Sequence, residues 1–432
     1  MNRMPKMALM ACALVLCAGA TCGQGLPRAK KPEDAGFSQE RLERVTRFFE
    51  AEVDKKAIPG ATVLVARDGK VVYERAIGFQ DREKSVTMRA DAIFRMASMT
   101  KPITSVALMM LAEEGKIDLL GPVSQYLPEF KDVKVGVQKT DASTGQTTLV
   151  LEDVKRAMTV QDLLRHTSGL VYGPFGNTLV HQAYNQANLF DRSQTLADLV
   201  AKLAKLPLAH QPGTVWEYSM STDVLGRIVE VASAMPFDQF VAERITKPLG
   251  MNDTAFYLTS EQAPRLAELQ VDPATGKRPE ASTADNLTRE RVKWFSGGGG
   301  MLSTAEDYAR FCQMLLNGGQ LGGVRLLSPK TIAVMTSDQL LPGMALAGFE
   351  DLAPTPEMGQ SFGLGFAIRT TLGPNPLDGS VGDYFWAGIY GTYFWIDPPT
   401  KTFALLMVQM PFPQAGPYRR ALRELVYGAM VR

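Results

Sequence analysis

The sequence predicts an α+β protein in which one antiparallel sheet is built from both ends of the chain and flanked by helices, with a mostly helical insert between them. Two observations lead to this prediction. Alternating apolar runs occur at residues 60–81 and strand patterns return after residue 362, whereas helices and long loops dominate between about residues 120 and 290. The 432 residues, 45% apolar and 21% charged, are sufficient for two lobes around a large shared core.

The first 20 residues are predicted to be a secretory signal peptide. Two basic residues precede an apolar stretch, residues 7–20, which ends in small side chains and is too short to favour a membrane span. Cys12, Cys17 and Cys22, in or just after this region, raise the alternative of a lipoprotein, but none follows a good lipobox. We therefore expect a periplasmic or secreted protein with no integral membrane segment, and lipid anchoring is the less favoured alternative.

A single domain of two lobes is predicted for residues 37–432. The sheet lobe takes about residues 37–118 and 295–432, and the helical lobe takes about residues 119–294. Residues 21–36, which are polar and contain Pro and Gly, precede the domain as a leader tail.

Local signals predict the elements in order. Helical spacing over residues 38–56 begins at a Ser cap. Residues 60–81 give two apolar runs around Asp68-Gly69, which is a strong hairpin signal, and an apolar helix that begins at Ser98 follows.

The rest of the chain continues this pattern. A small hairpin is predicted at residues 134–154, and a helix at residues 159–170 is expected to end at Gly169. A further apolar-faced helix covers residues 221–235, and four glycines precede a capped helix within residues 294–319. Strand patterns and one last helix close the chain.

A lysine in an otherwise apolar helix points to chemistry. Lys101 is the only charged side chain between Arg95 and Glu113, and it shares a helix face with Ser98, three residues earlier. The helix N-terminus offers free N–H groups to an oxyanion, and burial disfavours the ammonium form of a lysine. A neutral amine beside a serine hydroxyl activates that nucleophile without histidine. The alternative is a lysine that extends from the helix end to water, and this motif alone does not decide between them.

Five segments, taken in order, resemble the serine β-lactamase and penicillin-binding-protein superfamily, and most of all the class C β-lactamases and their family VIII carboxylesterase relatives. These segments are residues 91–130, 163–170, 212–230, 297–311 and 386–398. The resemblance spans about residues 37–430 and implies the two-lobe β-lactamase/transpeptidase-like fold.

The resemblance implies roles for three side chains. Ser98 would be the acylated nucleophile, Lys101 its proton partner, and Tyr218, which opens the sequence YSM, a base or proton shuttle bonded to the nucleophile. Which of Lys101 and Tyr218 takes the first proton stays open, since such a pair titrates as a unit. Without the resemblance, Tyr218 would be a core aromatic with a satisfied hydroxyl.

The resemblance also implies roles for the sequence WAG, residues 386–388, and its neighbour Ile389 in the oxyanion hole and in substrate binding. Gly388 would permit close backbone approach, and the N–H groups of Ile389 and Ser98 would form the oxyanion hole. Where β-lactamases of this group have Lys-Thr-Gly, Trp386 replaces the cation that would meet a substrate carboxylate. Met220 stands where their pattern has Asn, and a thioether cannot orient an amide. Both changes make the substrate-binding residues more apolar and favour a neutral ester.

Other motifs carry less weight. The sequence GQSFG around Ser361 fits the elbow of α/β-hydrolases, but all histidines precede Ser361, so that triad order is not met and a loop is predicted instead. His166, His181 and His210 have no metal-ligand spacing, and no metal or cofactor is expected; His166 is assigned to a turn that supports the site. The glycines at 297–300 are predicted to make a tight crossing close to the pocket.

We therefore expect an exported serine hydrolase that cleaves carboxylic esters of small to medium acyl groups. The alternatives are a β-lactamase, D-amino-acid peptidase or acyltransferase of the same fold, and a non-catalytic binder of cell-wall peptide. The formal net charge of +1 argues against nucleic-acid or anionic-lipid partners. A small-molecule ester or acyl substrate is the expected partner, and the oligomeric state is not predicted.

Overall fold

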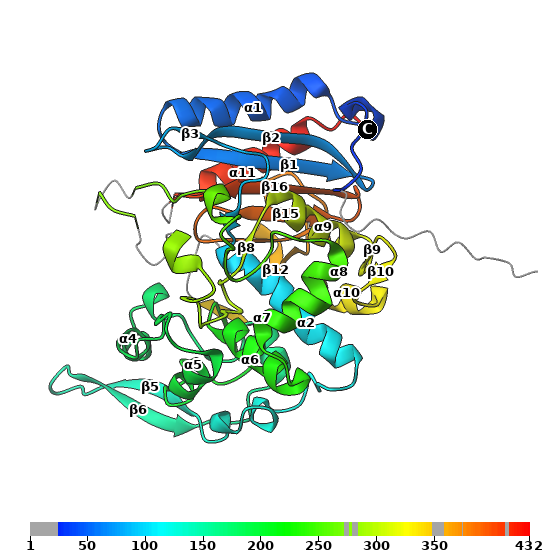
Figure 1. Ribbon diagram of the computed structural model, residues 1–432. Coiled ribbons are helices and arrows are strands. Elements are labelled where there is room, and N and C mark those ends of the chain that lie inside the picture. The colour runs from blue at the N-terminus through cyan, green and yellow to red at the C-terminus, as the bar shows by residue number, and fades with distance from the viewer. Residues whose placement is uncertain (1–24, 272–275, 279–283, 348–357, 374, 411–413) are drawn as a thin grey trace, which may run out of the picture.

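The computed structural model describes residues 25–271, 276–278, 284–347, 358–373, 375–410 and 414–432 (Figure 1). The predicted signal peptide lies outside these residues. Within them, no helix is long and apolar enough to cross a membrane.

One eight-stranded sheet joins the two ends of the chain, with the strand order β12-β13-β14-β15-β16-β1-β2-β3. Its strands are β1 (Gly60–Arg67), β2 (Lys70–Asp81), β3 (Val86–Thr87), β12 (Gln360–Phe362), β13 (Ala367–Arg369), β14 (Tyr384–Ala387), β15 (Tyr393–Asp397) and β16 (Thr402–Val408). The N-terminal strand β1 pairs antiparallel with β16 in the register Ala61↔Val408 to Arg67↔Thr402. The predicted antiparallel sheet from both termini is therefore confirmed.

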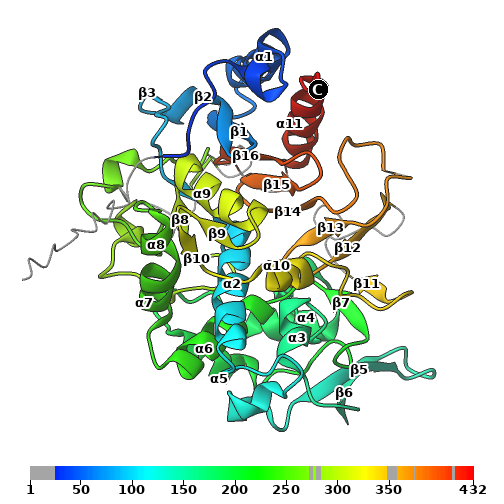
Figure 2. The ribbon, with the colours of Figure 1, turned by 90° about the vertical axis from the view of Figure 1, so that its right-hand side faces the viewer.

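Helices cover both faces of this sheet (Figures 1 and 2). Helices α1 (Gln39–Asp54) and α11 (Gly416–Gly428) pack together on one face, and α9 (Ala305–Leu316) packs against β1, β15 and β16 on the other. Coverage on both faces explains why β16 is buried at every position rather than alternating between core and solvent. The Asp68-Gly69 turn has positive φ at both residues, 49° and 76°, as a type I′ hairpin turn requires.

Helix α2 (Thr100–Glu113) runs from the sheet into the helical region, where it packs on α6 (Ser221–Ser233) (Figure 2). The other helices are α3 (Val160–Leu164), α4 (Leu179–Gln186), α5 (Leu196–Leu203), α7 (Phe237–Val241), α8 (Lys247–Leu249) and α10 (Pro329–Met335). Short strand pairs complete the fold: β4 (Phe94–Arg95) with β8 (Leu302–Ser303), β5 (Lys134–Thr140) with β6 (Thr147–Asp153), β7 (Val215–Glu217) with β11 (Ala345–Ala347), and β9 (Gln320–Leu321) with β10 (Val324–Arg325).

Three local predictions differ from the structure. Helix α3 ends at Leu164 rather than Gly169, because His166 already takes a left-handed conformation with φ of 57°. Ser361 lies in strand β12 rather than in a loop, and its hydroxyl donates to Asp338. Part of the predicted leader tail belongs to the fold, since Ala29 N–H donates to Val71 O at 2.9 Å.

Candidate active site

A cavity of about 300 Å³ opens beside the first turn of the Ser98 helix. Its walls come from the start of α2, from loops of the helical region, from the glycine run and from the end of β14. The lining residues used below are Ser98, Tyr172, Phe190, Arg192, Tyr218, Met220, Asp223, Gly298, Ile389 and Tyr390. Aromatic side chains are numerous among them, so the cavity offers a largely apolar surface to a substrate.

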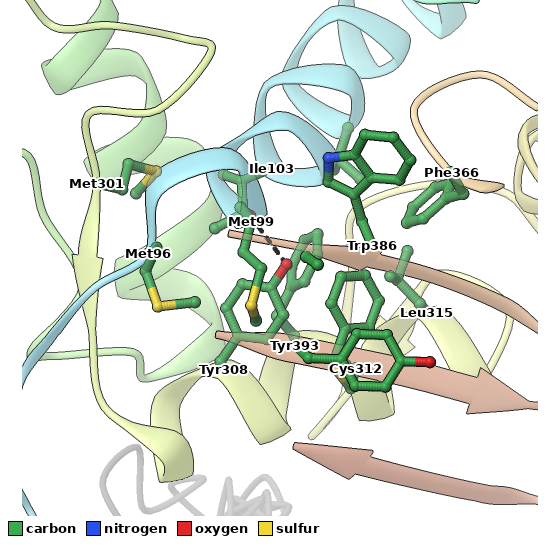
Figure 3. Packing of buried hydrophobic residues seen from close by; sticks show 14 of the residues in the cluster. Met96, Met99, Ile103, Met301, Tyr308, Cys312, Leu315, Phe366, Trp386 and Tyr393 are labelled. Carbon is green, nitrogen blue, oxygen red and sulfur yellow. Dashed lines mark hydrogen bonds between the residues drawn. The ribbon is translucent and has the colours of Figure 1, made fainter. Parts of the chain in front are cut away.

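Ser98 is held in a 3₁₀ turn, Ala97–Met99, that leads directly into α2. The core beneath this turn fixes it: the Tyr308 hydroxyl donates to Met99 O at 2.9 Å (Figure 3), and Thr392 Oγ1 donates to Met96 O at 3.1 Å. Ala97 has a φ of 44°, an uncommon conformation for a residue with a Cβ. The packed core therefore holds Ala97 in an uncommon backbone conformation and thereby places the adjacent Ser98 at the cavity wall.

Lys101 lies beneath Ser98 with only 1% of its surface exposed. Its Nζ is 3.3 Å from Ser98 Oγ, and it donates to Gly298 O at 2.7 Å. Burial lowers the pKa of Lys101 to about 7, and the nearby carboxyl of Asp223 opposes only part of that change. No carboxylate among the described residues forms an ion pair with this amine. The alternative prediction, that the Lys101 side chain extends to water, is therefore wrong.

Tyr172 is a second phenol at the site, and no local pattern in the sequence indicates it. Its hydroxyl lies 3.2 Å from Lys101 Nζ, and the two residues are 71 positions apart. Burial raises the pKa of the Tyr172 hydroxyl, and the charges of Asp223 and Tyr218 add to that rise. Tyr172 follows the sequence RHTSGL, so proximity to that motif was the only available pointer.

Tyr218 lies beside Lys101, as the resemblance implied. The amine of Lys101 is 4.5 Å from the centre of the Tyr218 ring. The Tyr218 hydroxyl is buried and forms no hydrogen bond of normal geometry with the described residues. Burial raises the pKa of this phenol, and interactions with the side chains of Ser98 and Trp386 offset only part of the rise. Hydroxyl, amine and phenol thus meet at one point, where the side chains of Ser98 and Tyr218 interact.

Asp223, in the first turn of α6, closes the back of the site. It accepts a hydrogen bond from Ser296 Oγ at 2.6 Å, and burial raises its pKa. A Cβ at Gly298 would lie 2.3 Å from Asp223 Oδ2, so a larger residue would displace Asp223 at the point where the chain presents its carbonyl to Lys101. The predicted tight crossing of the glycine run beside the pocket is confirmed.

The end of β14 approaches Ser98 closely. A Cβ at Gly388 would lie 2.4 Å from Met96 O, which explains the need for glycine. The next residue, Ile389, lines the cavity, and its N–H donates to no acceptor among the described residues. That amide is therefore available to an oxyanion, together with the N–H of Ser98 at the start of its helix.

Met220 and Trp386, which stand where the β-lactamase pattern has Asn and Lys, occupy different places. Met220 lines the cavity, whereas Trp386 is fully buried and does not line it. Trp386 packs against the Tyr218 ring with centroids 5.3 Å apart and supports that phenol from behind. The expectation that Trp386 faces the substrate is thereby corrected to a supporting position.

The histidines lie outside the reacting groups. His166 Nδ1 is 3.1 Å from Ser219 Oγ and its ring packs 5.0 Å from that of Tyr218, so it supports the site as predicted. His181 and His210 both bond Glu217, at 2.9 and 2.7 Å. Among the described residues, no cluster of His, Cys, Asp or Glu could hold a metal ion.

Known proteins resemble this chain over nearly its whole length. The profile of the Beta-lactamase family matches residues 45–428. Protein Rv1367c of Mycobacterium tuberculosis is 35% identical over 82% of this chain and 87% of its own, and esterase EstB of Burkholderia gladioli is 30% identical over 91% and 96%. The solved structure of EstCE1, described as a hydrolase with promiscuous acyltransferase activity, superposes with a TM-score of 0.74 at 27% identity, covering 90% of this chain and 99% of its own.

Proposed function

The chain belongs to the beta-lactamase family of serine hydrolases, and we propose that it cleaves carboxylic esters of small to medium acyl groups through an acyl-enzyme on Ser98. One observation carries this proposal. The amine of Lys101 is buried, has a pKa of about 7, and lies 3.3 Å from the Ser98 hydroxyl in an apolar cavity. Such an amine is neutral in an appreciable fraction of molecules at physiological pH, which a general base requires.

The contacts of Lys101 support its role as the first base. A neutral amine has two N–H donors and one lone pair. Gly298 O can only accept, at 2.7 Å, and Tyr172 Oη accepts the second N–H at 3.2 Å. The lone pair is then left for the Ser98 O–H. Tyr218, whose pKa burial raises, is protonated at neutral pH and serves better as a proton donor than as the first base.

Acylation follows from this arrangement. Lys101 takes the Ser98 proton while Oγ bonds to the ester carbonyl carbon, and the N–H groups of Ser98 and Ile389 stabilise the oxyanion. As the bond to the alcohol oxygen breaks, the proton held by Lys101 passes to that oxygen, either directly or through the Tyr218 hydroxyl. A water molecule then attacks the acyl carbon and gives a proton to the same amine. The bond between the acyl carbon and Ser98 Oγ breaks, the amine returns that proton to Oγ, and the acid leaves.

The cavity supports an ester rather than a β-lactam or peptide. Met220, which lines the cavity, offers no amide-orienting group where the β-lactamase pattern has Asn. The esterase EstB among the relatives agrees with this preference. Acyl transfer to an alcohol is the second candidate, because an aromatic-lined cavity favours an organic alcohol over water and EstCE1 is described as having such activity.

The test is a comparison of substrate classes on the purified protein. We expect steady turnover of 4-nitrophenyl butyrate, little turnover of nitrocefin or a D-Ala-D-Ala peptide, and a butyryl adduct on Ser98 detectable by intact mass. Ser98→Ala should lose turnover and adduct while keeping its melting temperature. Strong nitrocefin turnover with negligible ester cleavage would replace the esterase by a β-lactamase. Absence of any adduct on folded wild type would favour a non-catalytic binder.

We also propose that the protein acts outside the cytoplasm, because residues 1–20 have the pattern of a signal peptide. Cell fractionation followed by mass analysis of the N-terminus tests this. Full-length chain confined to the cytoplasmic fraction would contradict it.

A further inference from the structure

The cavity contains a cation, Arg192, that has no ion-pair partner in the described part of the chain. Arg192 lies in the loop between α4 and α5 and lines the cavity together with Ser98 and Tyr390. Among the residues that the structure describes, no carboxylate forms an ion pair with Arg192 and no atom accepts a hydrogen bond from it. An arginine carries five N–H donors and is almost always charged. Because Arg192 is half-buried and has no acceptor among these residues, its N–H donors remain available to an anionic ligand.

The loop is built in a way that keeps this cation free. The adjacent carboxylate, Asp191, is occupied by Ser193, whose N–H and hydroxyl donate to Oδ1 at 2.9 and 2.7 Å. Gln194 Nε2 donates to Leu189 O at 2.7 Å and fixes the loop from inside. The nearest acid in the sequence is therefore engaged in holding the turn and does not neutralise Arg192.

A second arginine, Arg95, interacts electrostatically with Arg192. Arg95, which is buried, forms an ion pair with Glu268 at 3.2 Å. Burial lowers the pKa of Arg95, and the charge of Arg192 contributes to the same effect, so the two guanidinium groups act on each other. Tyr390 interacts with both arginines. An anion that entered here would relieve this repulsion and would meet the Arg192 donors directly.

We propose that Arg192 is a specificity residue that binds a carboxylate on the substrate, at a distance from the ester bond that Ser98 attacks. The preferred substrates are then esters that carry one negative charge, on either the acyl or the alcohol side. This inference rests on the proposed esterase function. The cation that recognises the substrate would then lie in the α4–α5 loop. In the β-lactamase pattern it lies on β14, at the position that Trp386 occupies in this chain.

The experiment uses two matched substrate pairs on the full-length protein. Mono-4-nitrophenyl adipate is compared with 4-nitrophenyl hexanoate, which places the charge on the acyl side. The second pair, 4-acetoxybenzoate and methyl 4-acetoxybenzoate, places it on the alcohol side. Each is assayed with wild type, Arg192→Gln, Arg192→Lys, and the control Arg47→Gln, which removes an exposed charge on α1.

For one pair, we expect Arg192→Gln to lower kcat/KM of the anionic ester by about tenfold or more, while the neutral ester changes less than about twofold. Arg192→Lys should restore part of the loss, higher salt should reduce the wild-type preference, and Arg47→Gln should change nothing. The pair that responds identifies the side of the substrate that Arg192 meets.

Two results would overturn the proposal. Equal losses of kcat/KM on the charged and neutral esters in Arg192→Gln would assign Arg192 a structural role. No loss of kcat/KM on either anionic ester would show that Arg192 does not bind a substrate carboxylate. Both outcomes require that wild type hydrolyses the neutral esters. If it hydrolyses none of them, the esterase proposal itself has failed, and the two failures are thereby distinguished.

Discussion

Lys101 and Arg423 are both almost fully buried, with 1% and 2% of their surfaces exposed, but their surroundings are opposite. Lys101 has no ion-pair partner among the described residues. Arg423 bonds Asp383, and it donates to Tyr393 Oη at 3.1 Å and to Asp378 O at 2.7 Å. Burial alone would lower the pKa of Arg423, but Tyr393 and Asp383 outweigh it and raise the pKa.

The difference separates a reactive cation from a structural one. A buried charge with a full set of partners stays charged and ties elements together, here α11 to the sheet. A buried amine that lacks a carboxylate partner loses its proton near neutral pH, which is costly for stability but useful for catalysis. The following predictions test whether this contrast holds, in order of expected effect.

Lys101→Met should have the largest effect. Removal of the proposed base should lower kcat/KM for 4-nitrophenyl butyrate by roughly a thousandfold, within the usual range for general-base loss. Thermal unfolding should show a melting temperature equal to or above that of wild type, because a desolvated amine is removed. Retention of more than about a tenth of the wild-type rate would make Lys101 a structural residue.

The same substitution has a signature in the pH dependence of stability. The folded-state pKa of Lys101, about 7, lies below the unfolded value of 10.5. Between these values the unfolded chain binds more protons, so wild-type stability should rise with pH across this window. Urea unfolding measured at several pH values should show that rise in wild type and not in Lys101→Met.

Arg423→Met should act in the opposite sense. It leaves Asp383 with a weakened set of partners in the core, and we expect a loss of about 3–5 kcal/mol in the free energy of unfolding. Turnover per folded molecule should be unchanged, because Arg423 does not line the cavity. Urea unfolding combined with a burst-titrated assay measures both quantities. A loss below about 1 kcal/mol would show that Arg423 is not an important structural residue.

Tyr172→Phe should have a smaller effect than Lys101→Met, because it changes the pKa of the Lys101 amine without removing that amine. The lost hydroxyl is an acceptor for Lys101, so the ammonium form loses more than the neutral form and the pKa should fall further. We expect kcat/KM to drop by about tenfold and the midpoint of its pH profile to move to lower pH. Tyr73→Phe is the control, since that phenol is also buried and bonded, to Thr46 at 2.8 Å, but lies on β2. Similar losses in both variants would contradict the assignment.

The sequence predicted the sheet and most helices because their signals are local. Asp68-Gly69 defines the hairpin, and Ser38, Thr159 and Thr304 each cap a helix through a side-chain oxygen, as the structure confirms. Where local signals competed, prediction failed: Gly169 looked like a helix end, but the chain had already turned at His166.

The site was only partly predictable for the same reason. Ser98 and Lys101 are three residues apart on one helix, so their proximity follows from helical geometry. Tyr172 and Arg192 lie in loops whose positions depend on tertiary packing, and no spacing rule brings them to the serine. Asp223 looked like an ordinary acidic residue in the first turn of a helix, where such residues are common.

The most direct test is the pH dependence of kcat/KM for a neutral ester such as 4-nitrophenyl butyrate. The reacting form requires neutral Lys101, so the rate should fall about tenfold per pH unit below a midpoint near 7 and level off above it. A profile that is flat from about pH 5.5 to 9, or that falls as the pH rises, would show that a buried, unpaired lysine is not the base.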